Sequence, residues 1–265
     1  MAATNIDKYA IIGGGASSYS GIDNAYNTVY IYDSSGTKLN NSTLSDKVKL
    51  ASGGKVGNYA VIAGGADYNG NREQQVTAFS SSLTKPTINS LTYAAAAMEA
   101  TTVGNHLIFG GDYNVQVAQG YTNALVRETP ISLNSSNSFM GAATAGDYAI
   151  FVGSGSTTTV IDKNYTKQTS VTLSQSRYGI AGVTLKDYAI FAGGGTQVNG
   201  GGSSYSTVDA FDSNLQRSTP TALSQSRGFI KGAAIDKYAV FPGGSPAGYL
   251  ATYGVSNVVD VYTVN

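Results

Sequence analysis

Tyrosine is the side chain best suited to binding in this sequence, which has 19 tyrosines, one histidine and no cysteine. Several tyrosines fall in segments rich in serine, glycine and asparagine, at 16–26, 66–73, 196–205 and 245–253. A tyrosine ring offers a large contact area at little entropic cost, and the small polar residues around it can hydrogen-bond a ligand. We therefore expect a recognition surface for a glycan or a protein. The alternative is that these segments are plain polar connections anchored by their aromatic residues.

Oxygen-bearing side chains alternate at Asp67, Asn69, Asn71 and Glu73, in the manner of the first half of a calcium-binding loop. The pattern departs from such a loop because its glycine is misplaced and the later bidentate glutamate is missing. These four residues are the calcium candidate of the sequence. We otherwise expect no metal site and no cofactor.

The composition excludes several classes of protein. The 16 basic and 16 acidic residues cancel, and charged residues make up only 12% of the chain. A nucleic acid or an anionic membrane favours a basic patch, so neither is expected as a partner. No run of 18 apolar residues is present, which argues against membrane insertion. The first residues lack the basic and apolar regions of a signal peptide, so the compartment stays open.

The elements that must position these side chains follow from a six-fold internal repeat. A short apolar strand starts at Tyr9, Tyr59, His106, Tyr148, Tyr188 and Tyr238, and each copy has a glycine five residues further on. Another strand ends at Tyr32, Phe79, Tyr121, Ile161, Phe211 and Tyr262. Twelve residues after the first five of these ends comes a recurrent leucine, at Leu44, Leu91, Leu133, Leu173 and Leu223. Repeats of roughly 40–50 residues built from short strands predict the blades of a propeller.

Each repeat is predicted to contain four antiparallel strands, here called first to fourth from the inside outwards. Glycine-asparagine dipeptides, as at Gly57-Asn58 and Gly104-Asn105, predict a tight hairpin between the first and second strands. The distance from the end of one third strand to the next second strand is always 27 residues, so all variation in length falls between second and third strands. These variable connections share one face with the connections between repeats. Because function concentrates on loops held by a rigid scaffold, that face is the expected binding surface.

The repeat resembles the kelch repeat along the whole chain. The resemblance is carried by the paired glycines that end the second strand, by the third strand ending in Tyr-Asp or Phe-Asp, and by Leu-Ser-x-Ser-Arg before the next repeat. The tryptophan that usual kelch repeats carry is absent, since the chain has none. The resemblance implies a six-bladed β-propeller of four-stranded antiparallel blades, most similar to the glycine- and serine-rich kelch-like arrays of bacteria and their phages.

The same resemblance gives a role to two arginines. Arg177 and Arg227 hold a position whose arginines reach the ligand face in kelch propellers, so they resemble an anion clamp; the alternative is that they pack flat on neighbouring turns. The full set of predicted ligand-binding residues is Tyr19, Tyr26, Tyr68, Arg72, Tyr93, Arg177, Tyr178, Tyr205, Arg227, Tyr249 and Tyr253. Lys49, Glu99 and Lys231 are expected to line the central channel, where a water-mediated pair of Glu99 and Lys231 is favoured over catalysis.

The strand count is incomplete in the sixth repeat, because its fourth strand is found at neither end of the sequence. We expect one propeller domain, 1–265, with blades near 1–45, 46–92, 93–134, 135–174, 175–224 and 225–265, the last lacking its outer strand or closed imperfectly. An uncovered edge invites pairing with another chain, so residues 257–264 are a candidate for self-association.

The sequence therefore predicts a non-catalytic recognition module that binds a glycan or a protein through its variable loops. Family likeness and polar composition favour an extracellular, cell-surface or virion-associated protein, such as an adhesin or a phage tail component. The alternative is an architectural or engineered propeller with no ligand of its own. An enzyme that modifies sugars, such as a kelch-like epimerase, is the third interpretation, because a carboxylate and arginines near the axis could do acid–base work.

Overall fold

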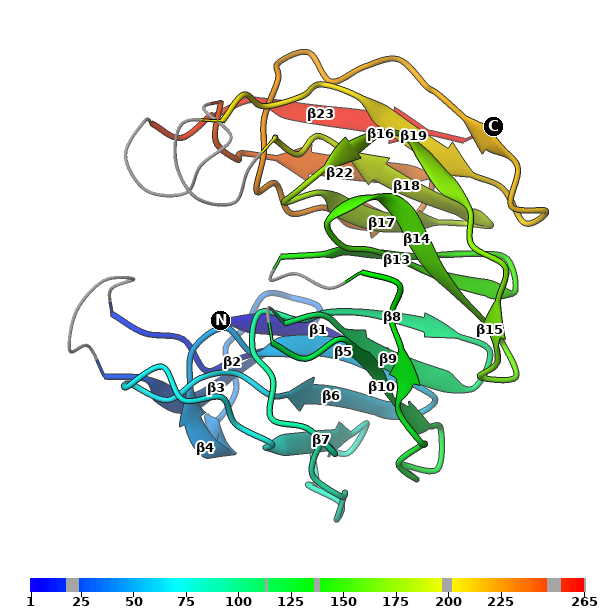
Figure 1. Cartoon of the computed structure of the whole chain (residues 1–265). Helices are drawn as coiled ribbons and strands as arrows, with labels where there is room; N and C mark the ends of the chain where they lie inside the picture. The colour runs from blue at the N-terminus through cyan, green and yellow to red at the C-terminus, as the bar shows by residue number, and fades with distance from the viewer. Residues whose placement is uncertain (18–23, 113, 136–138, 197–201, 247–253, 265) are drawn as a thin grey trace. The chain divides into compact units, whose positions relative to one another are not determined.

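The computed structural model describes residues 1–17, 24–112, 114–135, 139–196, 202–246 and 254–264. All its regular elements are β-strands, which form six antiparallel sheets that succeed one another along the chain (Figure 1). In the described part no helix is long and apolar enough to cross a membrane. The contacts divide the chain into two compact units, an N-terminal unit of residues 1–132 and a C-terminal unit of residues 133–265.

The N-terminal unit holds the first three sheets. The first sheet contains β1 (Ala2–Ile6), β2 (Tyr9–Gly13), β3 (Tyr26–Tyr32) and β4 (Ser42–Val48). The second contains β5 (Ser52–Val56), β6 (Tyr59–Ala63) and β7 (Val76–Ser80). The third contains β8 (Glu99–Val103), β9 (His106–Gly110), β10 (Val117–Thr122) and β11 (Ile131–Ser132).

The C-terminal unit holds the other three sheets. The fourth sheet contains β12 (Gly141–Ala145), β13 (Tyr148–Val152), β14 (Gly155–Asp162), β15 (Lys167–Gln168) and β16 (Thr172–Arg177). The fifth contains β17 (Ala181–Leu185), β18 (Tyr188–Ala192), β19 (Val208–Phe211) and β20 (Arg217–Ser218). The sixth contains β21 (Ala233–Ile235), β22 (Tyr238–Pro242) and β23 (Val259–Thr263), so among its described residues it lacks an outer strand, as expected.

The second sheet also has only three strands, which the repeat did not predict. The segment that should form its fourth strand contains Pro86, which has no backbone N–H and cannot donate to a ladder. Leu91 at its end is nevertheless buried, and its amide donates to the carbonyl of Gln74. The recurrent leucine therefore keeps its place although the strand is not formed.

The predicted hairpins between first and second strands are confirmed in all six sheets. Val56 pairs with Tyr59 across Gly57-Asn58, and Ala145 pairs with Tyr148 across Gly146-Asp147. Gly57 and Gly146 both have φ of 51°, a left-handed value that glycine adopts without cost. These two-residue turns make one end of every sheet short and uniform.

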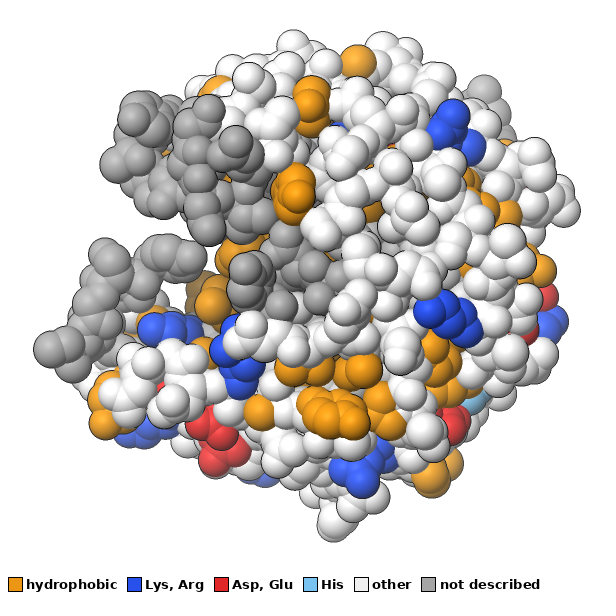
Figure 2. Space-filling model, viewed as in Figure 1, with side chains coloured by type: hydrophobic (Ala, Val, Ile, Leu, Met, Phe, Trp, Pro, Cys, Tyr) orange, Lys and Arg blue, Asp and Glu red, His pale blue; other side chains and the backbone are white. Residues whose placement is uncertain are grey.

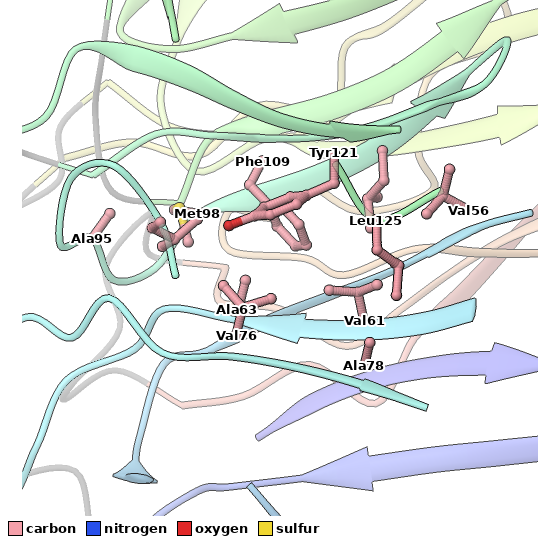
Figure 3. Packing of buried hydrophobic residues seen from close by; sticks show 12 residues of the cluster. Val56, Val61, Ala63, Val76, Ala78, Ala95, Met98, Phe109, Tyr121 and Leu125 are labelled. Atoms are coloured by element: carbon pink, nitrogen blue, oxygen red, sulfur yellow. The ribbon is translucent and has the colours of Figure 1, made fainter. Parts of the chain in front are cut away.

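The hydrophobic core of each unit consists of clusters between consecutive sheets. In the N-terminal unit the first strands β1 and β5 contact each other, as do β5 and β8; in the C-terminal unit β17 contacts both β12 and β21. Figure 3 shows one cluster, in which Phe109 and Tyr121 of the third sheet pack toward Val61 and Ala63 of the second. The recurrent leucines are all buried, between 1% and 4% exposed. Four of them, Leu44, Leu91, Leu173 and Leu223, belong to clusters that join two consecutive sheets, which explains their fixed spacing.

Candidate functional site

The variable loops and the connections between sheets lie side by side at one end of the sheets. Lys49, which leaves the first sheet, exchanges two backbone hydrogen bonds of 2.7 and 2.8 Å with Ala66 in the loop of the second sheet. Gly228 and Ser245 make the same exchange between the fifth and sixth sheets. We call this end of each unit its loop face, and the end formed by the two-residue turns its hairpin face. The predicted gathering of both kinds of connection on one face is confirmed within each unit.

Three of the predicted tyrosines are strongly exposed on the loop face of the N-terminal unit. Tyr26 is 43% exposed, Tyr68 is 53% exposed and Tyr93 is 50% exposed. Tyr178 and Tyr205 in the C-terminal unit are half-buried. Tyr19, Tyr249 and Tyr253 lie outside the described residues. Figure 2 shows that Lys, Arg, Asp and Glu side chains are scattered over the visible surface, between hydrophobic side chains and a larger area of other side chains and backbone.

Tyr68 and Tyr93 project from backbone that is held by side-chain hydrogen bonds, exposed in the turn of Tyr68 and part-buried at Tyr93. The amide of Tyr93 donates to Oε1 of Gln119 at 2.8 Å, and Nε2 of Gln119 donates back to the Tyr93 carbonyl at 3.0 Å. Gln119 itself is only 1% exposed. Tyr68 sits in a turn in which the Asp67 carboxylate accepts from the amide and the side chain of Asn71, at 2.8 and 2.9 Å. The two exposed rings are therefore attached to a rigid support.

Arg72, four residues after Tyr68 in the same loop, is partly exposed and forms an ion pair with a buried carboxylate. Its Nε lies 2.5 Å from Oδ2 of Asp112, which is 1% exposed. Asp112 also accepts from the amide of Ala96 at 2.7 Å and from the amide of Asn114 at 2.8 Å. The backbone of Asp112 has φ of 105°, close to the 109° of Gly65 at the same place in the second sheet. A non-glycine residue in this region is strained, and its hydrogen bonds hold it there.

The anion clamp predicted for Arg177 and Arg227 is not what the structure shows. Both side chains have 0% of their surface exposed, so they cannot reach a ligand on the loop face. Arg177 donates to the carbonyls of Gly193 and Thr207, at 2.7 and 2.6 Å, and to the carboxylate of Asp209. Burial lowers the pKa of Arg177, and the adjacent Asp209 opposes that effect. The alternative interpretation, arginines packed against neighbouring backbone, describes the geometry.

Arg227 repeats this arrangement in the sixth sheet. Its Nη1 donates to the carbonyls of Gly243 and Val258, at 2.5 and 3.0 Å, and its Nη2 donates to Asp260. Asp209 and Asp260 were not predicted as partners of these arginines, although the sequence carries a signal for them. Each lies two residues before the last aromatic residue of its third strand. Only the fifth and sixth repeats, which Arg177 and Arg227 precede, have an aspartate at this position.

These ion pairs belong to a joint that recurs between the sheets. The residue after the recurrent leucine donates its amide to a side chain of the next third strand: Ser174 to Asp209 at 3.1 Å and Ser224 to Asp260 at 3.0 Å. Elsewhere neutral acceptors serve, as when Ser45 donates to Thr77 at 3.2 Å. Asn134 likewise donates to Thr159, at 2.8 Å. The joint fixes the base of the loop face, and Arg177 and Arg227 support the loop face of the C-terminal unit in this way.

The residues predicted to line a channel have separate surroundings. Lys49 is half-buried and bonds Ala66 through its backbone, as described above. Glu99 begins β8 in the N-terminal unit, whereas Lys231 precedes β21 in the C-terminal unit. Lys231 is exposed at a small pocket of about 100 Å³, which Phe139 and Phe229 also line. The proposed pairing of Glu99 with Lys231 stays a prediction.

The calcium candidate is engaged in its own turn. Asp67 is held by Asn71, and the amide of Glu73 donates to the Gly65 carbonyl at 2.8 Å. Burial, followed by the charges of Asp46 and Asp67, raises the pKa of Glu73 above its usual value. Within the described ranges, no cluster of three acidic or histidine side chains could hold a metal ion. The face thus offers aromatic rings, amides and hydroxyls, which suit binding through stacking and hydrogen bonds.

Comparisons with known proteins identify the architecture. No family model matches the chain, and no curated protein matches it either. The solved structure titled "Structure of YjhT", a known β-propeller, matches 99% of this chain and 94% of its own, with a TM-score of 0.62 and 13% sequence identity. The protein is a β-propeller. At this identity the likeness concerns the fold, and function must be argued from the loop face.

Proposed function

We propose that this propeller is a non-catalytic recognition module, which binds a glycan or a protein through the loop face of its N-terminal unit. The observation that carries the proposal is the exposure of Tyr68 and Tyr93 on backbone held by side-chain hydrogen bonds, which are exposed in the turn of Tyr68 and part-buried at Tyr93. An exposed aromatic ring that is fixed in place loses little entropy on binding. Asn69, Asn71 and Arg72 lie beside Tyr68 in the same loop and supply polar groups for hydroxyls.

Within this proposal we favour a glycan, because flat aromatic rings stack on sugar faces while amides bond the hydroxyls. We infer a setting outside a bacterial cell, as in an adhesin or a phage tail component, from the polar composition and the kelch resemblance. The kelch assignment is part of the same proposal; it is supported by the paired glycines at 64–65, 193–194 and 243–244, all at positive φ. A catalytic role is not proposed, because the arginines it would use are buried in structural ion pairs.

The test is a glycan-array screen of the purified protein and of the double variant Tyr68→Ala/Tyr93→Ala. The matched control is Tyr188→Ala/Tyr238→Ala, which removes two rings that are 37% and 38% exposed at the starts of β18 and β22, next to the hairpin face. Binding that is lost in the first variant and kept in the control supports a sugar site on the loop face. If no glycan binds the wild type, the ligand is not a sugar. A protein partner or a purely architectural propeller then replaces this account.

A second proposal concerns the edge of the sixth sheet. Strand β23 pairs with β22 on one side, and no described strand covers its other side. Val259 and Val261 on it are 53% and 55% exposed. We infer that residues 257–264 associate edge to edge with a second copy, since the same apolar edge on two copies is self-complementary. Light scattering at high micromolar concentration should show a dimer that Val261→Lys abolishes; a monomeric wild type would refute it.

A further inference from the structure

Asp112 stands at a position where the repeat favours glycine. Six residues after the start of each second strand, the sequence has Gly15, Gly65, Asp112, Ser154, Gly194 and Gly244. The four glycines have φ between 93° and 109°, and Asp112 has φ of 105°. A side chain is strained in this conformation and also crowded, since a Cβ at Gly65 would lie 2.9 Å from the carbonyl oxygen of Lys49. Such strain concentrates at functional sites, so the aspartate of the third sheet calls for a functional reason.

The carboxylate of Asp112 contacts both segments that carry the exposed tyrosines. Its Oδ2 accepts from Nε of Arg72 at 2.5 Å, and Arg72 belongs to the loop of Tyr68. The same oxygen accepts from the amide of Ala96 at 2.7 Å, in the connection that carries Tyr93. The aspartate is 1% exposed and its bond to Ala96 is buried, so water competes little for it. Asp112 therefore ties the two segments to one point of the third sheet.

Other joints hold the corresponding connection through backbone groups. The amide equivalent to that of Ala96 donates to a backbone carbonyl in three of them, from Lys49 to Ala66, from Tyr178 to Gly195 and from Gly228 to Ser245. Such a bridge joins a connection to the sheet that it enters. A carboxylate has lone pairs for several donors, so Asp112 can also hold the loop of the preceding sheet through Arg72.

The two tyrosine segments also adjoin along their backbones. Nε2 of Gln74 donates to the carbonyl of Thr92 at 3.0 Å, and the carbonyl of Gln74 accepts from the amide of Leu91 at 2.9 Å. The connection that carries Tyr93 thus runs beside the base of the Tyr68 loop. One aromatic ring stacks on the face of one sugar unit. Two rings on adjoining segments, held at a fixed separation, therefore suit two units of the same glycan chain.

We propose, on the basis of the glycan-binding function above, that Asp112 is a positioning residue that makes Tyr68 and Tyr93 one site for an oligosaccharide. Two contacts with one ligand reinforce each other when their separation matches that of the ligand groups. The reinforcement is lost when the separation varies, although each ring still binds a single sugar unit. An oligosaccharide, rather than a monosaccharide, is therefore the ligand class of this surface.

The experiment compares two affinities by titration calorimetry of the whole chain. The probes are the oligosaccharide that binds most tightly on the array and the methyl glycoside of its terminal sugar. The wild type should bind the oligosaccharide more tightly than the methyl glycoside, by about tenfold or more. Asp112→Gly should lose about tenfold in affinity for the oligosaccharide and stay within about twofold of the wild type for the methyl glycoside. Impaired folding would lower both affinities together, so their ratio separates positioning from stability.

Asp112→Asn and Asp212→Gly are the matched variants. The asparagine keeps an acceptor for the Ala96 amide but loses the charge that holds Arg72, so its affinity ratio should be intermediate. Asp212 also accepts from two backbone amides, both at 2.9 Å, in a turn of the C-terminal unit away from this site. Asp212→Gly should leave the affinity ratio at the wild-type value.

A measurement without ligand tests the contacts of Asp112 themselves. Hydrogen exchange followed by NMR should show that the Ala96 amide exchanges about tenfold or more faster in Asp112→Gly than in the wild type. The Ala97 amide, which donates to the Leu50 carbonyl at 2.8 Å, should be unchanged.

Three results would overturn the role of Asp112 and leave the glycan-binding function standing. They are equal exchange of the Ala96 amide in both proteins, an affinity ratio unchanged in Asp112→Gly, and a wild type that binds the methyl glycoside as tightly as the oligosaccharide. A wild type that binds no glycan would overturn both proposals.

Discussion

The two faces of each unit are built on different rules. On the hairpin face all six turns have two residues, and the first residue of each has φ between 50° and 53°. On the loop face the connections vary in length, carry the most exposed tyrosines, and are supported from below by the joints between sheets. The contrast shows that the scaffold limits variation to one face. Recognition is therefore expected where the backbone is free to vary and its base is fixed.

The largest expected effect comes from breaking a joint beneath the loop face. Arg177→Ala removes the buried cation beside Asp209, which keeps only the more distant Arg217, 3.8 Å away, and the hydrogen bonds from Ser174. It also leaves the carbonyls of Gly193 and Thr207 short of a donor. Removing one partner of a buried ion pair costs about 3–5 kcal/mol of unfolding free energy. Chemical denaturation of wild type and variant measures it. A loss below about 1 kcal/mol would show that the joint does not support the face.

The joint of the second sheet can be transplanted to sharpen this result. The triple variant Arg177→Val/Thr207→Gln/Asp209→Thr copies Val48, Gln75 and Thr77, which do the same work without charge. Because neutral, satisfied groups avoid the desolvation of a buried ion pair, we expect it to regain at least half of the stability lost in Arg177→Ala. Chemical denaturation of the triple variant and of Arg177→Ala tests this expectation. If the triple variant is no more stable than Arg177→Ala, the charged and the neutral joints are not equivalent.

A smaller effect is expected from the turns of the hairpin face. Gly146→Ala places a Cβ at φ of 51° and 2.6 Å from Cβ of Ser213, so it should cost about 1–3 kcal/mol. Gly36→Ala is the matched control, since its Cβ would meet nothing within 4 Å at a φ of 78°. Thermal unfolding of both variants should show the larger loss for Gly146→Ala. Equal losses would mean that the hairpin face is not tightly packed.

The smallest effect concerns a charge on the loop face. Burial and neighbouring acids raise the folded-state pKa of Glu73 above its usual value of 4.5, so its ionisation destabilises the folded state. Below pH 4.5, the unfolding free energy of Glu73→Gln should equal that of the wild type. As the pH rises from 4.5 through the raised pKa, the variant should become more stable than the wild type. The difference should stay under about 1 kcal/mol, because water screens a part-buried charge. Denaturation at pH 4 and pH 7 measures it; a wild type that gains stability over the variant at pH 7 would reverse the sign.

Much of the fold could be predicted because the repeat places the same residue types at fixed distances along the sequence. Residues at equivalent positions then pack in equivalent places in each sheet. The recurrent leucines, the two-residue turns and the incomplete sixth sheet follow from residue positions alone. The burial of Arg177 could not, because an arginine at a loop base can point outward or inward with the same spacing. Asp209 held the missing information, since a charged partner two residues before Phe211 favours the inward orientation. The proline that interrupts the outer strand of the second sheet was equally readable in the sequence.

The comparison of faces is tested most directly by one affinity measurement. The ligand found by the array is titrated against wild type, Tyr68→Ala/Tyr93→Ala and Tyr188→Ala/Tyr238→Ala, after confirming equal unfolding free energies. Loss of two stacking aromatic contacts should weaken binding by about 100-fold in the loop-face variant, whereas the hairpin-face variant should stay within about twofold of the wild type. Equal weakening in both variants, or in neither, would contradict the assignment of recognition to the loop face.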